Sequence, residues 1–165
     1  MPLNDNDNEK TIFNLLFIAK WISLGFGSGK APIAPGTFGT LVGVLIVYLL
    51  SDLSVTVYIG LTVLFYFLGV WASQVYSDYL GVHDHGSIVW DEVVGYMITM
   101  IAIPIHWQWM LIGFILFRLF DIWKPWPIRW LDEKVHGGTG IMIDDVLAGI
   151  YAWLILYLLV QFFPI

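Results

Sequence analysis

Two pairs of adjacent carboxylates stand where long apolar segments begin. Asp91 and Glu92 open the run "WDEVVGYMITM", and Asp144 and Asp145 open "DDVLAGIYAWLILYLLV". A carboxylate beside hydrocarbon loses its hydration and needs a cation or a hydrogen-bond donor instead. A single pair is explained equally well by a helix dipole, which favours acids in the first turn, with Ser87 as the N-cap. The repetition of the pair favours a shared cation.

The ligands that these segments offer to a cation are hard oxygens, and the chain has no cysteine. Adjacent residues of a helix point about 100° apart, so each pair can turn one carboxylate inward and the other toward a second ion or a supporting contact. Oxygen ligands contributed by facing helices favour Mg²⁺ over softer metals. We therefore expect the metal ligands to be Asp91, Glu92, Asp144 and Asp145.

A third apolar segment contributes a further acid in "FRLFDIWKPWP". Asp121 follows Arg118 by three residues, so the two side chains share a helix face and can form an ion pair. A purely structural salt bridge is an equal alternative for Arg118. Asp121 lies at the depth expected for the acid pairs, and Lys124 adds a second cation. We expect Asp121 and Arg118 to support the site.

The stretch "APIAPGTFGT" predicts a seat for phosphate. Its prolines stiffen the backbone, and Gly36 and Thr37 then lead into a helix. The N-terminus of a helix attracts anions, and the hydroxyl groups of Thr37 and Thr40 are potential donors. The glycine clusters "GFGSG" and "HGGTG" are more typical of turns.

Three histidines fall on the same side of the chain as the acid pairs. A histidine in a loop is usually only a solvated side chain, but "HDH" precedes the first acid pair closely. His85 is therefore a candidate general acid or base. His136 is a candidate phosphate contact and His83 a candidate supporting residue, whereas His106 belongs to the opposite side.

Composition places these residues in a membrane protein. Of 165 residues, 59% are hydrophobic and 12% charged, and the mean hydropathy is +0.80. Soluble domains carry about 25% charged residues. The 9 Trp and 11 Phe suit membrane–water interfaces. A formal charge of −6 argues against nucleic acid as a partner.

The expected fold is all-α, a polytopic membrane helical bundle of about five membrane-embedded helices with an interfacial amphipathic helix before them. The five segments are residues 38–50, 55–71, 87–105, 107–122 and 144–162. Residues 11–27 mix a lysine into an apolar pattern, which predicts the interfacial helix. Residues 1–10 predict a polar, disordered tail without the features of a signal peptide, and residues 11–165 a single domain.

The basic residues predict the orientation. All seven lie before the first segment or around the loop between the fourth and the fifth, and positive charge marks the cytoplasmic side. Five crossings then bring together on that side the entry segment "GFGSGKAPIAPGTFGT", the loop "SDYLGVHDHGSIVWDE" and the loop "DIWKPWPIRWLDEKVHGGTGIMIDD".

A small ion-coupled transporter or channel is the alternative, because acids within membranes also mark ion pathways. A non-catalytic scaffold with acids that only cap helices is a second alternative. Against conduction, the middles of the predicted spans carry no charge.

Taken together, "GFGSG", "APIAPGTFGT", "GVHDHGSIVWDE", "FRLFDIWKPWPIRW" and "VHGGTGIMIDD" resemble the motifs of the phosphatidylglycerophosphatase A family in order and approximate spacing. The resemblance extends from about Gly25 to Tyr157. One departure is Gly39-Thr40, where the family commonly has Gly-Ser.

The resemblance implies a Mg²⁺-dependent phosphatase of the bacterial inner membrane. Its substrate would be phosphatidylglycerophosphate, whose terminal phosphomonoester is hydrolysed to give phosphatidylglycerol. With Mg²⁺ as cofactor, Asp91, Glu92, Asp145 and His85 would be the catalytic residues, and Gly36, Thr37, Thr40 and His136 would hold phosphate. Direct attack by water is the expected mechanism, with a covalent aspartyl-phosphate as the alternative.

Overall fold

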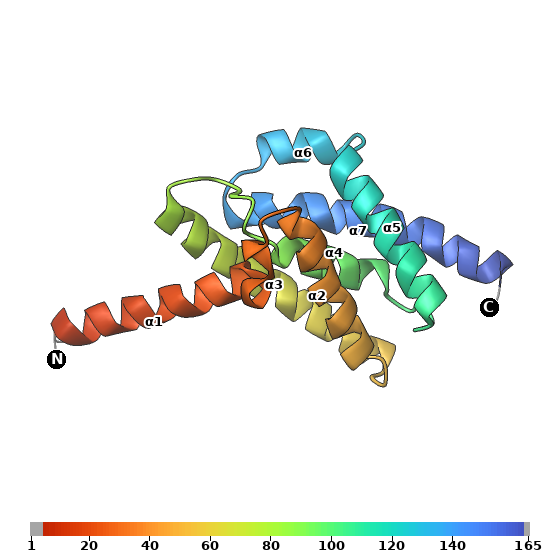
Figure 1. Cartoon of the computed structure of the whole chain (residues 1–165), viewed down its shortest axis with the longest axis horizontal. Coiled ribbons are helices and arrows are strands. Elements are labelled where there is room, and N and C mark those ends of the chain that lie inside the picture. Colours follow the sequence, from red (N-terminus) through yellow and green to blue (C-terminus); the bar gives the residue numbers. More distant parts are fainter. Residues whose placement is uncertain (1–4, 164–165) are drawn as a thin grey trace.

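The computed structural model describes residues 5–163, and within that range every regular element is a helix (Figure 1). The elements in order are α1 (Asp5–Ser23), the 3₁₀ helix η1 (Gly25–Lys30), α2 (Pro35–Leu49), α3 (Val55–Leu80), α4 (Trp90–Thr99), α5 (Trp107–Trp123), α6 (Ile128–Lys134) and α7 (Gly137–Phe162). The predicted all-α fold class is confirmed. The short helix α6 lies in a loop for which no helix was predicted.

Helix α4, which carries the first acid pair, lies at the centre of the bundle between α2 and α7. Its side chains include several without any solvent exposure: Val93, Val94, Tyr96 and Met97. A Cβ atom on Gly149 of α7 would collide with the carbonyl of Gly95, and one on Gly95 would collide with Phe117. Small residues at helix crossings allow such close backbone approach. The packing therefore holds α4 firmly against its neighbours.

Two helices are long and apolar enough to cross a membrane. α3 and α7 each have 26 residues and contain an 18-residue stretch with a mean hydropathy of 1.9, and about 20 residues suffice for a span. Large apolar side chains such as Leu64, Phe67 and Leu158 are at least half exposed on the outside of the bundle. These features indicate membrane association.

The number of crossings stays a prediction. With ten residues, α4 is about 15 Å long, roughly half the hydrocarbon thickness of a bilayer. The predicted segment 87–105 is thus helical only from Trp90 to Thr99. Ala102 adopts a positive φ of 56°, and Pro104 cannot donate a backbone hydrogen bond, so the chain leaves the helix before Ile105.

The start of α4 also differs from the prediction. Its N-cap is Val89, without a side-chain capping bond. Ser87, predicted as the cap, instead places its Oγ 2.9 Å from Nδ1 of His85. Asp91 and Glu92 consequently occupy the first turn of α4, where a helix dipole favours acids.

Helix α7 begins earlier than predicted, at Gly137 instead of Asp144. The stretch "HGGTG" therefore opens a helix and is not a turn. The side-chain oxygen of Gln74 on α3 accepts a 2.7 Å hydrogen bond from the Gly138 amide, and a Cβ on Gly138 would collide with the carbonyl of Val70. This close contact with α3 places the second acid pair about two turns inside α7.

The N-terminal helix is longer than predicted. α1 begins at Asp5, so residues 5–10, predicted as a disordered tail, are helical, and the first four positions of that tail lie outside the described residues. α1 extends away from the bundle (Figure 1) and exposes Ile12, Phe13 and Phe17 by more than half. Its place in the membrane interface stays a prediction.

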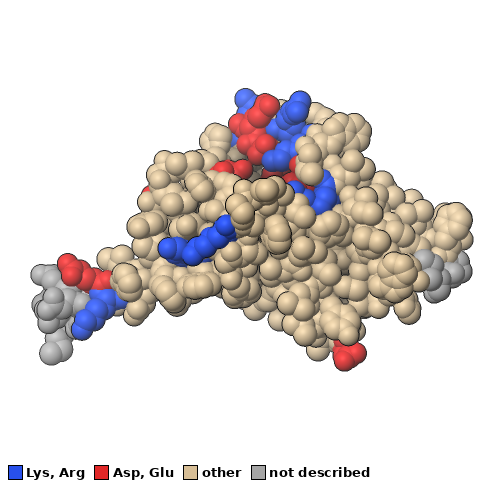
Figure 2. All heavy atoms as spheres, in the orientation of Figure 1, with Lys and Arg blue, Asp and Glu red and all other residues tan. Residues whose placement is uncertain are grey.

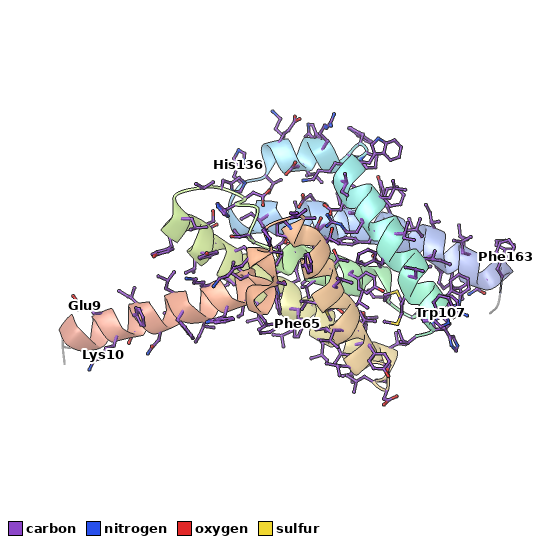
Figure 3. The ribbon with its side chains drawn as sticks, in the orientation of Figure 1. Glu9, Lys10, Phe65, Trp107, His136 and Phe163 are labelled. Atoms are coloured by element: carbon purple, nitrogen blue, oxygen red, sulfur yellow. The ribbon has the colours of Figure 1, made fainter. Side chains whose placement is uncertain are left out.

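The loops between the helices lie at two ends of the bundle. At one end, Gly29 approaches the carbonyl of Ser87, and the rings of His83 and His136 lie 5.4 Å apart, which brings together the three loops predicted to meet. Charged side chains gather there over α6 and the adjacent end of α5 (Figure 2). Trp107 marks the opposite end of α5, away from His136 (Figure 3).

Candidate metal and phosphate site

Three carboxylates converge where α4 and α7 cross. Asp91, Glu92 and Asp145 each offer an oxygen, and these oxygens lie within 4.8 Å of one another. We call these three residues the acid cluster. Asp145 is 2% exposed and Asp91 is 8% exposed, so water cannot hydrate the carboxylates freely. The cluster unites three of the four predicted metal ligands.

The acid cluster is chemically incomplete without a positive charge. Asp91 Oδ1, Glu92 Oε2 and Asp145 Oδ2 are buried and have no hydrogen-bond partner within the described residues. Two charged carboxylates no more than 4.8 Å apart repel each other by at least about 3.5 kcal/mol at an effective dielectric of about 20. Two oxygens on opposite sides of a Mg²⁺ ion are about 4.2 Å apart. The spacing of the carboxylates and their unpartnered oxygens are therefore compatible with a divalent cation.

Helix α5 supports the acid cluster from a third side. Arg118 forms an ion pair with Asp121, and its Nη1 lies 3.7 Å from Oε1 of Glu92. Asp121 in turn lies beside Asp145. Two of the three predicted supporting residues, Arg118 and Asp121, thus reach the site, and the guanidinium compensates only part of the negative charge.

Asp144, the fourth predicted ligand, lies outside the acid cluster, although its buried Oδ1 also has no hydrogen-bond partner within the described residues. Its Oδ2 lies 2.6 Å from the Lys124 ammonium, which also lies 3.0 Å from Asp132 on α6. Burial lowers the pKa of Lys124, but the two carboxylates outweigh it and hold that pKa above its ordinary value. Lys124 therefore stays charged and neutralises Asp144.

The sequence pattern identified Lys124 only as a second cation and assigned no role to Asp132. A lysine that follows an apolar helix and shares a loop with acids is a signal that could have identified the pair. Asp132 could not be placed, because it belongs to α6, whose seven residues gave no recognisable helix pattern.

The first turn of α2 abuts the acid cluster. A Cβ atom on Gly36 would collide with Glu92 and approach Arg118 Nη1 to 3.1 Å, so only glycine fits there. Thr37 is next in the chain and partly exposed. Thr40 is fully buried, and its hydroxyl donates to the Gly36 carbonyl at 2.9 Å. Of the predicted phosphate contacts on α2, Gly36 and Thr37 therefore remain as candidates for donation.

The histidines form a separate group at the same end of the bundle. The rings of His83 and His136 pack edge to face, and both line an open pocket of about 530 Å³, which Gln74 and Asp78 also line. His85 is exposed in the loop before α4. The Ser87 amide donates to its Nδ1 at 3.2 Å, which leaves the proton of a neutral ring on Nε2.

Comparison with protein families identifies one match. The sequence profile described as Phosphatidylglycerophosphatase A matches residues 21–160. This range contains the acid cluster, α5, α6 and the first turn of α2.

Individual relatives agree with this match. A phosphatidylglycerophosphatase A of Escherichia coli is 48% identical over 145 residues, which cover 87% of this chain and 84% of the relative. One from Haemophilus influenzae is 50% identical over 157 residues, covering 94% and 96%. A Bacteroides thetaiotaomicron protein, named as a candidate phosphatidylinositol-3-phosphatase, is 40% identical over 148 residues, covering 85% and 92%. No solved structure matches the chain.

Proposed function

The chain belongs to the phosphatidylglycerophosphatase A family, and we propose that it hydrolyses the terminal phosphomonoester of phosphatidylglycerophosphate with the help of Mg²⁺. As a member of this family the chain is a phosphatase. The observation that supports the proposed metal dependence is the acid cluster, whose buried oxygens lack partners. The products are phosphatidylglycerol and inorganic phosphate.

The proposed metal ligands are Asp91, Glu92 and Asp145. Carboxylate oxygens are the ligands that Mg²⁺ takes up in proteins, and three of them already lie within 4.8 Å of one another. In this proposal Asp144 acts indirectly, because Lys124 holds it beside Asp145 in the chain. When bound, Mg²⁺ polarises the phosphoryl group and offsets the charge that develops on the leaving oxygen.

The residues around the acid cluster position the substrate. Arg118, held by Asp121, presents its guanidinium beside Glu92, where it can donate to a phosphate oxygen. The amide end of α2 at Gly36 and Thr37 adds a partial positive charge on the same side. A phosphate between these groups lies next to the carboxylates.

Hydrolysis then proceeds by direct attack of water on phosphorus. A carboxylate of the acid cluster takes a proton from the water, the bond between phosphorus and the glycerol oxygen breaks, and that oxygen receives a proton. His85, His136 and His83 are the nearby titratable groups that can deliver this proton. A covalent aspartyl-phosphate is the alternative route.

The proposed location is the bacterial inner membrane, with several crossings and the site at the cytoplasmic face. Four of the seven basic residues stand at the site end of the bundle: Arg118, Lys124, Arg129 and Lys134. Positive charge beside membrane segments favours the cytoplasmic side. The lipid substrate can then keep its acyl chains in the bilayer.

An ion-conduction role is not favoured. Among the described residues, the buried charged side chains are Asp91, Asp144 and Asp145, all at the site end. Between the two ends the described core is largely apolar, with Val47, Phe117 and Leu156 fully buried. The hydroxyls of the buried Thr62 and Thr99 are bonded to backbone carbonyls. A conduction path would need polar groups along that depth.

The relatives' names share a chemical feature. Phosphatidylglycerophosphate and phosphatidylinositol 3-phosphate each carry a phosphodiester and a phosphomonoester on one polyol head group. We propose that the present chain likewise prefers lipids with both groups over phosphatidic acid, which has a phosphomonoester alone.

Phosphate release from phosphatidylglycerophosphate by the purified full chain in detergent tests the proposed function. We expect turnover with Mg²⁺ that disappears with a chelator, returns on addition of Mg²⁺, and is lost in a folded Asp91→Asn variant. Turnover in chelator would exclude the metal role. The absence of turnover under every condition would overturn the function.

A further inference from the structure

A second groove lies at the site end of the bundle, where α5 ends and α6 begins. Its volume is about 480 Å³, and its lining comprises Trp123, Lys124, Trp126, Arg129, Trp130 and Glu133, with Pro125 between them. Trp126 is 81% exposed and Trp123 64% exposed. Exposed tryptophans together with cations are typical of surfaces at the level of lipid head groups.

Lys124 connects this groove to the proposed reaction site. Lys124 lines the groove, and its ammonium lies 2.6 Å from Asp144, which precedes Asp145 of the acid cluster in the chain. A ligand in the groove is therefore adjacent to the carboxylates and can be part of the same lipid molecule.

Arg129 is the cation that the groove offers to a ligand. The charge of Lys124 is shared between Asp132 and Asp144. Arg129 is exposed, and no ion pair is found for it among residues 5–163. Glu133 lines the same groove and is the acid that competes with a bound anion for Arg129.

We propose that the groove binds the phosphodiester of the lipid substrate, with Arg129 donating to its oxygens and the tryptophan rings packing against the glycerol carbons. This inference rests on the proposed function, because it assigns the phosphomonoester of the same molecule to the acid cluster. Phosphatidic acid cannot occupy both places, since it has no phosphodiester. The groove therefore determines substrate selectivity.

Binding of the product lipid tests the groove without hydrolysis. Short-chain phosphatidylglycerol keeps the phosphodiester and lacks the phosphomonoester, and its binding can be followed by tryptophan fluorescence. Arg129→Gln should weaken binding about tenfold, the loss of one charge-assisted hydrogen bond. Glu133→Gln should strengthen binding. Lys134→Gln, which removes another α6 charge outside the groove lining, should leave it unchanged.

Two results of this titration would overturn the proposal. One is unchanged binding in Arg129→Gln. The other is an equal loss of binding affinity in Arg129→Gln and Lys134→Gln. That result would indicate attraction of anionic lipid by overall charge, or binding of bulk membrane lipid without a defined binding site.

Kinetics with two soluble substrates provide the second arm. For short-chain phosphatidylglycerophosphate, Arg129→Gln should raise KM about tenfold and leave kcat nearly unchanged. For short-chain phosphatidic acid, KM should not change. Equal effects on both substrates would exclude the phosphodiester seat. If the wild-type protein releases no phosphate, the proposed function fails, and the titration alone still decides whether the groove binds a phosphodiester.

Discussion

The carboxylates of Asp91 and Glu92 on α4 both reach the acid cluster, whereas those of Asp144 and Asp145 on α7 part. Adjacent helical positions diverge by about 100°. The longer glutamate can bend back beside Asp91, but two short aspartates on α7 cannot converge, and Lys124 holds the outer one. The neighbouring side chains thus give two similar acid pairs different surroundings.

The largest expected effect separates the two aspartates of α7. Asp145→Asn should lower phosphatase activity about a thousandfold, because it removes a proposed ligand and its charge from the reacting phosphate. Asp144→Asn should lower activity only about tenfold, the scale of a supporting contact. The measurement is kcat/KM for phosphatidylglycerophosphate with each variant.

Thermal unfolding of the same variants is the control. In chelator, the unfolding temperature of Asp145→Asn should be no lower than that of the wild type, because the substitution removes repulsion within the acid cluster. Equal losses of activity in the two variants would mean that the pair acts as one unit and that the distinction between its members is wrong.

Metal affinity should sharpen the comparison between the pairs. The Mg²⁺ concentration that gives half-maximal activity should rise at least about thirtyfold in Glu92→Gln and stay within about threefold in Asp144→Asn. The proposed binding of Mg²⁺ to the folded chain predicts that Mg²⁺ also raises the unfolding temperature of the wild type. A larger shift of Mg²⁺ dependence in Asp144→Asn than in Glu92→Gln would make Asp144 the ligand.

Removing Lys124 should show how much free energy of unfolding depends on the neutralisation of Asp144. Lys124→Met leaves Asp144, whose side chain is 8% exposed, without its cation, and should lower the free energy of unfolding by about 1–3 kcal/mol. The double variant Lys124→Met/Asp144→Asn should regain part of that loss. Strictly additive effects in denaturant titrations would show that the two residues do not interact.

The sequence could predict which end of the bundle holds the acids, because apolar runs of known length alternate and the polar loops between them must then meet. It could not predict that α4 is only ten residues long, since its surroundings depend on glycine contacts such as that of Gly149 with Gly95. Nor could it predict the partner of Asp144, because side-chain direction on α7 depends on where that helix begins. Hydropathy indicates which segments are buried, but it determines neither the length of α4 nor the side-chain partner of Asp144.

The smallest expected effect concerns the two threonines of α2. Like Asp145 and Asp144, one is available to the reaction site and the other already has a partner within the protein. Thr37→Val should raise KM about three- to fivefold, the effect of one neutral hydrogen bond to a phosphate oxygen. Thr40→Val should change KM less than about twofold, because the hydroxyl of Thr40 already donates to Gly36. It should instead lower the stability of the protein, because a buried hydrogen bond is lost. Steady-state kinetics and thermal unfolding distinguish the two outcomes. A larger rise in KM for Thr40→Val would mean that its hydroxyl leaves Gly36 when substrate binds, and the first turn of α2 would then have to rearrange during the reaction.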